Sequence, residues 1–132
     1  MRGKRTAGYL NLISSFIHNF FDGFAIGAAF ASKSSITYIP VIIAIFAHEI
    51  PREMGDVGIL MKSNFDGCQT IFWNAIINTM SMVGVVVGLG LGSIGEAVQI
   101  YILTFVAGNF IYIGADIWRN LLKNKEAYLN II

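Results

Sequence analysis

The sequence predicts an all-α membrane protein, a bundle of four transmembrane helices, and three observations support this fold class. The 132 residues are 55% hydrophobic and only 13% charged, whereas soluble domains are about 45–50% apolar and about 25% charged. Four apolar stretches are each long enough to cross a bilayer, which takes about 20 residues. The segments between these stretches are rich in turn-forming residues.

The predicted spans lie, in chain order, at residues 8–31, 37–61, 68–92 and 96–118. Residues 1–132 are therefore expected to form a single integral, multi-pass transmembrane domain in the lipid bilayer, with no soluble domain. The basic start followed by an apolar run resembles a signal peptide. No small-residue cleavage site ends that run, so we expect a span there instead.

Lysine and arginine predict the orientation of the spans, because cytoplasmic loops carry an excess of both. Seven of these residues fall on one side of the predicted bundle: Arg2, Lys4, Arg5, Lys62, Arg119, Lys123 and Lys125. Only Lys33 falls on the other side, and Arg52 lies within a span. Both ends of the chain are therefore expected on the cytoplasmic side.

Glycines recur every four residues in the first span (Gly23, Gly27) and in the third (Gly84, Gly88, Gly92). Small residues at this spacing let membrane helices approach closely. We expect close packing within one bundle, and the alternative is a dimer face.

Composition excludes two classes of function. The net charge of +1 gives no electrostatic basis for a nucleic-acid partner. Cys68 is the only cysteine, so an intrachain disulfide and a CxxC motif are both impossible.

Two spans carry polar and ionisable residues, which are costly in a membrane and are therefore functional candidates. These residues are His18, Asn19 and Asp22 in the first span and His48, Glu49, Arg52, Glu53 and Asp56 in the second. His18 and Asp22 are four apart and share one helix face. Pro51 cannot donate a backbone hydrogen bond to the carbonyl of Ala47, so we expect a kink near His48.

Imidazole, carboxylate and amide donors together suit zinc or iron. The alternative is an intramembrane salt-bridge network in which Arg52 pairs with Glu49 or Asp56, and the residues alone leave both open. HEIPR also begins like the HExxH motif of zinc proteases, but Arg52 stands at the second histidine position and cannot coordinate zinc. We therefore do not expect a zinc protease.

The stretches GYLNLISSFIHNFFDGFAIGAAF and HEIPREMGDVGIL resemble the ZIP family of zinc and iron transporters, whose members read HNFxDGxAIGxxF and HEIPHExGDFAIL. FVAGNFIYIGADI resembles the family's next-to-last helix. The family has eight spans and binds metal between the fourth and fifth. The resemblance implies that the four spans here are the fourth to seventh, with the fourth starting in the cytoplasm.

The resemblance also implies metal ligands: His18, Asp22 and His48 at a primary site, and Asn19 and Glu49 at an adjacent second site. Arg52 stands where the family has a bridging histidine or glutamate. The LPEL-like motif after the seventh span is absent, and so are the first three spans and the eighth. A fragment of a longer transporter is therefore one expectation.

The resulting expectation is a ZIP-type transporter that moves Zn²⁺, or Fe²⁺, toward the cytoplasm as cargo, with no cofactor. Its partners would be the metal ion, the bilayer and either a second copy of the chain or a missing transporter half. The alternative is a metal-silent structural or regulatory subunit that assembles with complete transporters through its glycine faces.

Overall fold

Four helices form the structure, a computed structural model that describes residues 2–129 without the side chains of 2–4, 113, 116, 117, 120, 121 and 123–129. The helices are α1 (Arg2–Ala31), α2 (Ser35–Lys62), α3 (Gly67–Gly92) and α4 (Glu96–Leu129). Each predicted span lies within one of them, and no strand occurs among the described residues. The predicted all-α fold class is confirmed.

Short connections separate the helices, and a side-chain cap marks the start of α3. Lys33 and Asn64 adopt φ values of 55° and 63° in two of these connections. Asp66 starts α3 through a capping box, in which its side chain accepts from the backbone of Gln69 at 2.7 Å. Because the connections are short, successive helices alternate in direction.

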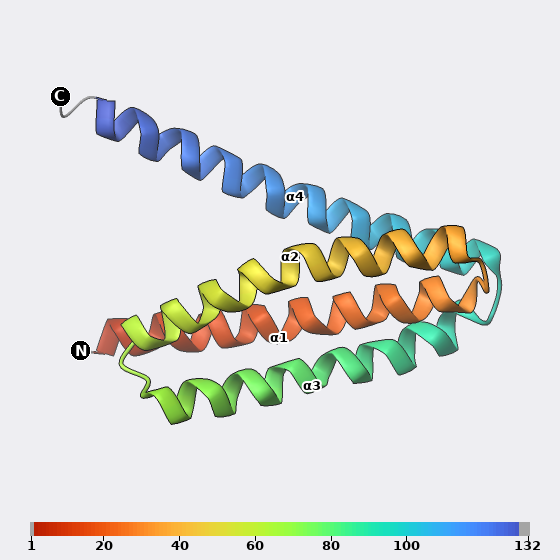
Figure 1. Ribbon diagram of the computed structural model, residues 1–132, viewed down its shortest axis with the longest axis horizontal. Coiled ribbons are helices and arrows are strands. Elements are labelled where there is room, and N and C mark those ends of the chain that lie inside the picture. Colours follow the sequence, from red (N-terminus) through yellow and green to blue (C-terminus); the bar gives the residue numbers. More distant parts are fainter. Residues whose placement is uncertain (1, 130–132) are drawn as a thin grey trace.

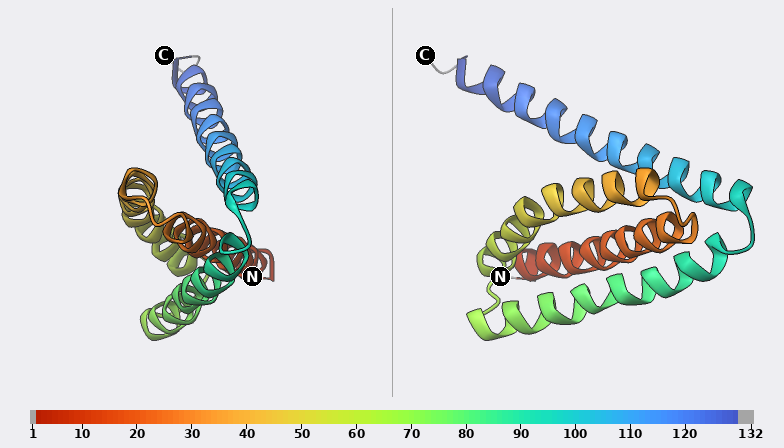
Figure 2. Two further views of the ribbon diagram at one scale, coloured as in Figure 1. Left: turned by 90° about the vertical axis from the view of Figure 1, so that its right-hand side faces the viewer. Right: turned by 45° about the vertical axis from the view of Figure 1, so that its right-hand side comes forward.

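The helices α1 and α3 run side by side in the same direction, α2 lies along the other side of α1, and α4 diverges from the bundle toward its C-terminal end (Figure 1). Figure 2 shows that α2 is curved along its length. It remains helical through Pro40 and Pro51. The missing backbone donor of each proline gives a physical reason for the curvature.

The predicted glycine packing joins α1 to α3. A Cβ atom at Gly23 would collide with the backbone carbonyl of Ser81, and one at Gly84 would collide with that of Phe20. Gly27 and Gly88 are equally close to backbone atoms of the facing helix. These glycine faces are therefore used inside the chain, as expected for close packing within one bundle.

Two apolar clusters lie at different heights in the bundle. One joins α1, α2 and α3 through Leu12, Leu60, Phe65 and Ile77. The other joins α1, α2 and α4 through Ala25, Ile45 and Val106. Along α1 the residues His18, Asn19 and Asp22 lie between Leu12 of one cluster and Ala25 of the other. Along α2 the polar residues from His48 to Asp56 likewise lie between the two clusters, so the fold places both sets in the middle of the bundle.

Large apolar side chains cover the outside of the bundle, among them Ile36, Val86 and Tyr112, each more than 70% exposed. Such a surface suits a hydrocarbon environment. By length and composition, α3 is the one helix in the described part of the chain that is apolar enough to span a membrane. The polar residues of α1 and α2 explain why those helices are less apolar.

Candidate metal site

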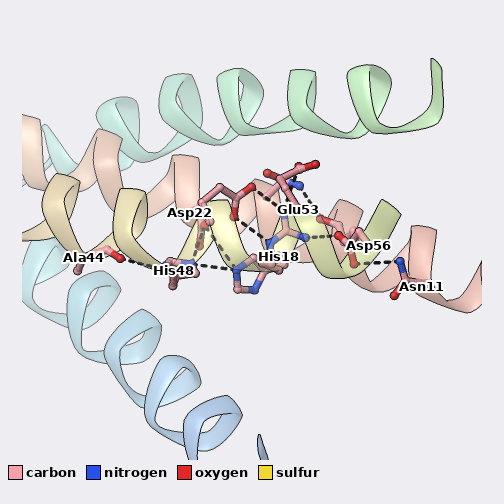
Figure 3. Close-up of polar contacts among 11 residues, drawn as sticks. Asn11, His18, Asp22, Ala44, His48, Glu53 and Asp56 are labelled. Atoms are coloured by element: carbon pink, nitrogen blue, oxygen red, sulfur yellow. Dashed lines mark hydrogen bonds and ion pairs between the residues drawn. The ribbon is translucent and has the colours of Figure 1, made fainter. Parts of the chain in front are cut away.

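Four potential metal ligands from α1 and α2 converge in the middle of the bundle: His18, Asp22, His48 and Glu49. One ligand atom from each lies within 4.8 Å of all the others. Figure 3 shows His18 and Asp22 facing His48 across the space between the two helices. Two motifs that are about thirty residues apart in sequence therefore meet at one point.

The closest part of this cluster is a triangle of three atoms. The Nε2 atoms of His18 and His48 are 3.1 Å apart, and Asp22 Oδ2 lies 3.1 Å from His48 Nε2 and 3.5 Å from His18 Nε2. Ligand atoms about 2.0–2.1 Å from a tetrahedral zinc ion are about 3.3–3.4 Å apart. The triangle thus has the size of one face of a zinc coordination tetrahedron.

The contact made by Nδ1 of His48 defines the tautomer of its neutral ring. His48 Nδ1 lies 2.8 Å from the carbonyl oxygen of Ala44. Because a carbonyl can only accept, Nδ1 carries a proton, and in the neutral form of the ring Nε2 then presents a lone pair. That lone pair faces the carboxylate of Asp22, which is itself an acceptor. A cation between these two atoms would satisfy both of them.

Asp22 gives a second indication of a cation. Its side chain is almost fully buried, and Oδ1 has no hydrogen-bond partner among the described residues. Buried carboxylate oxygens are normally satisfied, because leaving one unpaired costs about 1–3 kcal/mol or more. An ion at the triangle would supply positive charge to this carboxylate.

Asn19 is buried beside these ligands, at 3% exposure, and its amide nitrogen donates to the carbonyl of Ser15 at 3.1 Å. This bond uses the side-chain nitrogen of Asn19. The predicted role as a metal ligand requires the side-chain oxygen instead.

A salt-bridge network lies next to the triangle. Arg52 donates to both carboxylate oxygens of Glu49, at 2.8 and 2.5 Å, and to Asp56 Oδ2 at 2.7 Å. Glu53 is a further partner at 3.6 Å. The sequence left a metal site and a salt-bridge network as alternatives, and the structure places the residues of both side by side.

Asp56 connects this network to α1. Its carboxylate accepts from Asn11 at 3.0 Å and from Ser15 at 2.7 Å, and the residue is buried. Sequence reasoning missed both donors. Asn11 and Ser15 precede His18 by seven and three residues, so they continue the same helix face as His18 and Asp22. That helical periodicity was the available signal.

The same network bears on the zinc-protease alternative. Such an enzyme uses the glutamate of HExxH as its general base. Here that position is Glu49, and the guanidinium of Arg52 holds both of its oxygens. The carboxylate is arranged as an ion-pair partner instead of as a base.

Four helices with lipid-compatible surfaces and a partly buried cluster of potential metal ligands define a helical membrane protein with a candidate metal site. The family model for the ZIP zinc transporter matches residues 1–126, and the chain belongs to this family.

Relatives from animals and from a plant agree with this assignment. Human zinc transporter ZIP6 is 32% identical over 126 residues, covering 95% of this chain and 17% of the human protein. Mouse zinc transporter ZIP10 is 34% identical over 84% of this chain and 13% of its own length. IAA-alanine resistance protein 1 of Arabidopsis thaliana is 39% identical over 92% of this chain and 28% of its own length. The chain thus spans less than a third of each of these relatives, and no solved structure matches it significantly.

Proposed function

We propose that this chain forms the ion-binding part of a ZIP-type transporter that moves Zn²⁺, and Fe²⁺ as a second cargo, across a membrane toward the cytoplasm. His18, Asp22 and His48 would hold the ion, and Asn19 and Glu49 would receive it next. The observation that carries this proposal is the triangle of His18, Asp22 and His48 donor atoms, because its size matches a zinc coordination face and its acceptors face one another.

Transport of this kind changes no covalent bond, so the proposal includes no enzymatic step. The alternative function as a metal-silent subunit has less support. Its assembly surface was the set of glycine faces, which α1 and α3 use to pack against each other.

The proposed orientation places both ends of the chain in the cytoplasm. Its support is the distribution of Lys and Arg. Among the described side chains, Arg5, Lys62 and Arg119 lie at one end of the bundle and Lys33 at the other. The predictions for Arg2, Lys4, Lys123 and Lys125 lie outside the described side chains.

The test is a zinc titration of the purified protein in detergent, compared with His18→Ala and His48→Ala. Loss of a group that only orients a ligand typically costs 10–100-fold in metal affinity, so losing a ligand should cost more than about 100-fold. Thr79→Ala is the matched control, because Thr79 donates only to Ala75 of its own helix among the contacts described. Equal zinc affinity in all four proteins would remove the site.

The same titration gives the stoichiometry, for which we propose one zinc ion per chain. Arg52 places a positive charge between Glu49 and Asp56, and this charge would repel a second dication. Arg52→His replaces the cation with a ligand and should raise the stoichiometry toward two, whereas Arg52→Lys keeps the charge and should leave it at one. Two zinc ions in the unaltered protein would contradict this part of the proposal.

A further inference from the structure

One aromatic residue of α4 reaches the candidate metal site. The ring of Phe110 lies 4.7 Å from that of His48 and 6.1 Å from that of His18, between centroids, tilted by 60° and 58°. Phe110 also packs against the apolar cluster of Ala25, Ile45 and Val106. Its ring is therefore held between the two imidazoles and an apolar layer.

Phe110 also lines a cavity of about 310 Å³. Its lining is apolar and includes Ala25, Pro40, Val41, Ala44, Val106 and Phe110. Along each helix these residues lie one to two turns from the level of the histidines, toward the connections at 32–34 and 93–95. The cavity thus leads away from the metal site toward that end of the bundle.

A second cavity, of about 380 Å³, lies at that end of the bundle. Polar side chains line it, including Ser32, Thr37, Glu96 and Gln99, and it shares Leu103 with the apolar cavity. From the end of the bundle inward, the order is a polar hollow, an apolar cavity, the Phe110 ring and the imidazole pair. Phe110 lines the apolar cavity and also contacts the ring of His48.

We propose that the ring of Phe110 closes the metal site toward the apolar cavity, so that an ion exchanges along this route only when the ring moves aside. This inference rests on the proposed function, since it assumes that the histidines bind the ion. Apolar constrictions oppose the passage of a hydrated ion because they strip its water. A ring against both imidazoles also restricts their rotation while the ion is bound.

The arrangement of the helices lets a movement of α4 displace the Phe110 ring. Within the described residues, the backbone of α4 packs closely against α1 and α3 and not against α2. The contact between Phe110 and His48 therefore bridges α4 to α2 through side chains. A shift of α4 relative to α2 would withdraw the ring without breaking any backbone contact between those two helices.

The experiment measures zinc binding kinetics of the whole chain in detergent by stopped flow, with Zn²⁺ for association and an excess of chelator for release. Phe110→Ala should accelerate association and release alike, each about tenfold, which corresponds to about 1.4 kcal/mol of barrier. The Kd should stay within about threefold of the unaltered value, because a gate changes rates and not equilibrium. Phe110→Val, which keeps some packing against Val106, should change the rates in the same direction.

Two controls separate gating from support of the fold. Phe105→Ala makes the same change on the same helix, where the ring contacts Phe21 at 5.5 Å and is exposed. It should leave both rates unchanged, and Phe110→Leu, which refills the space with an apolar side chain, should restore slow exchange.

Failure of the gate and failure of zinc binding would give different results. Unchanged rates in Phe110→Ala and Phe110→Val would overturn the gate, with zinc binding intact. Release and Kd that rise by the same factor, with association unchanged, would also overturn it, because the ring would then only support the ligands. If the unaltered protein fails to bind zinc, the proposed function itself falls, and the gate falls with it.

Discussion

Arg52→Ala should destabilise the fold strongly, because Arg52 is the only cation that the described contacts place among Glu49, Glu53 and Asp56. Three hydrogen bonds shorter than 3 Å join its guanidinium to two of these carboxylates, and the side chain is only 18% exposed. Breaking a buried ion pair from one side costs about 3–5 kcal/mol in soluble proteins. The partial exposure and the remaining donors to Asp56 favour the lower end, about 3 kcal/mol.

Thermal unfolding of the purified protein in detergent would measure this loss. A change of about 3 kcal/mol in a domain of this size corresponds to a decrease in Tm on the order of 10 °C. Arg52→Lys should lie between the unaltered protein and Arg52→Ala, because lysine keeps the charge and loses the bidentate contact with Glu49.

Lys62→Ala is the matched control, since it removes one positive charge from an exposed position at the end of the same helix. Its Tm should change little. If Arg52→Ala lowers the Tm no more than Lys62→Ala does, the network contributes no net stability and the reasoning fails.

Two further predictions concern packing and topology. Gly84→Leu should destabilise the α1–α3 pair by about 1–3 kcal/mol or more, because its Cβ would meet the backbone of Phe20. Gly90→Leu on the same helix is the control and should be tolerated, since a Cβ there meets nothing within 4 Å. Equal Tm values for both variants would argue against the glycine interface. In a Cys68→Ser background, Arg5→Cys and Lys62→Cys should react with impermeant thiol reagents from the cytoplasmic side only, and Lys33→Cys from the opposite side; the reverse labelling pattern would mean that the orientation is inverted.

Local chemistry made much of the fold predictable from the sequence. The length of the apolar stretches predicted four helices, and turn-forming residues located their connections. The spacing of Arg52 from Glu49 and Asp56 predicted the ion pairs, because residues three and four apart on a helix are neighbours. These features depend on contacts within one helix or on the order of elements along the chain.

Features that depend on packing between distant helices were not predictable in this way. Glycine spacing predicted close approach, but it did not indicate that the first helix would pair with the third. No sequence pattern pointed to Phe110, whose ring contacts those of His48 and His18 from α4. For Asn11 and Ser15 the helical spacing from His18 predicted the shared helix face. It did not predict that Asp56 of α2 would accept their hydrogen bonds.

X-ray absorption at the zinc edge of the zinc-loaded protein would show whether two imidazoles and a carboxylate hold the ion. We expect two histidine nitrogens at about 2.0–2.1 Å together with oxygen ligands, and one histidine fewer in His18→Ala. A shell without imidazole, or one with sulfur at about 2.3 Å from Cys68, would contradict it.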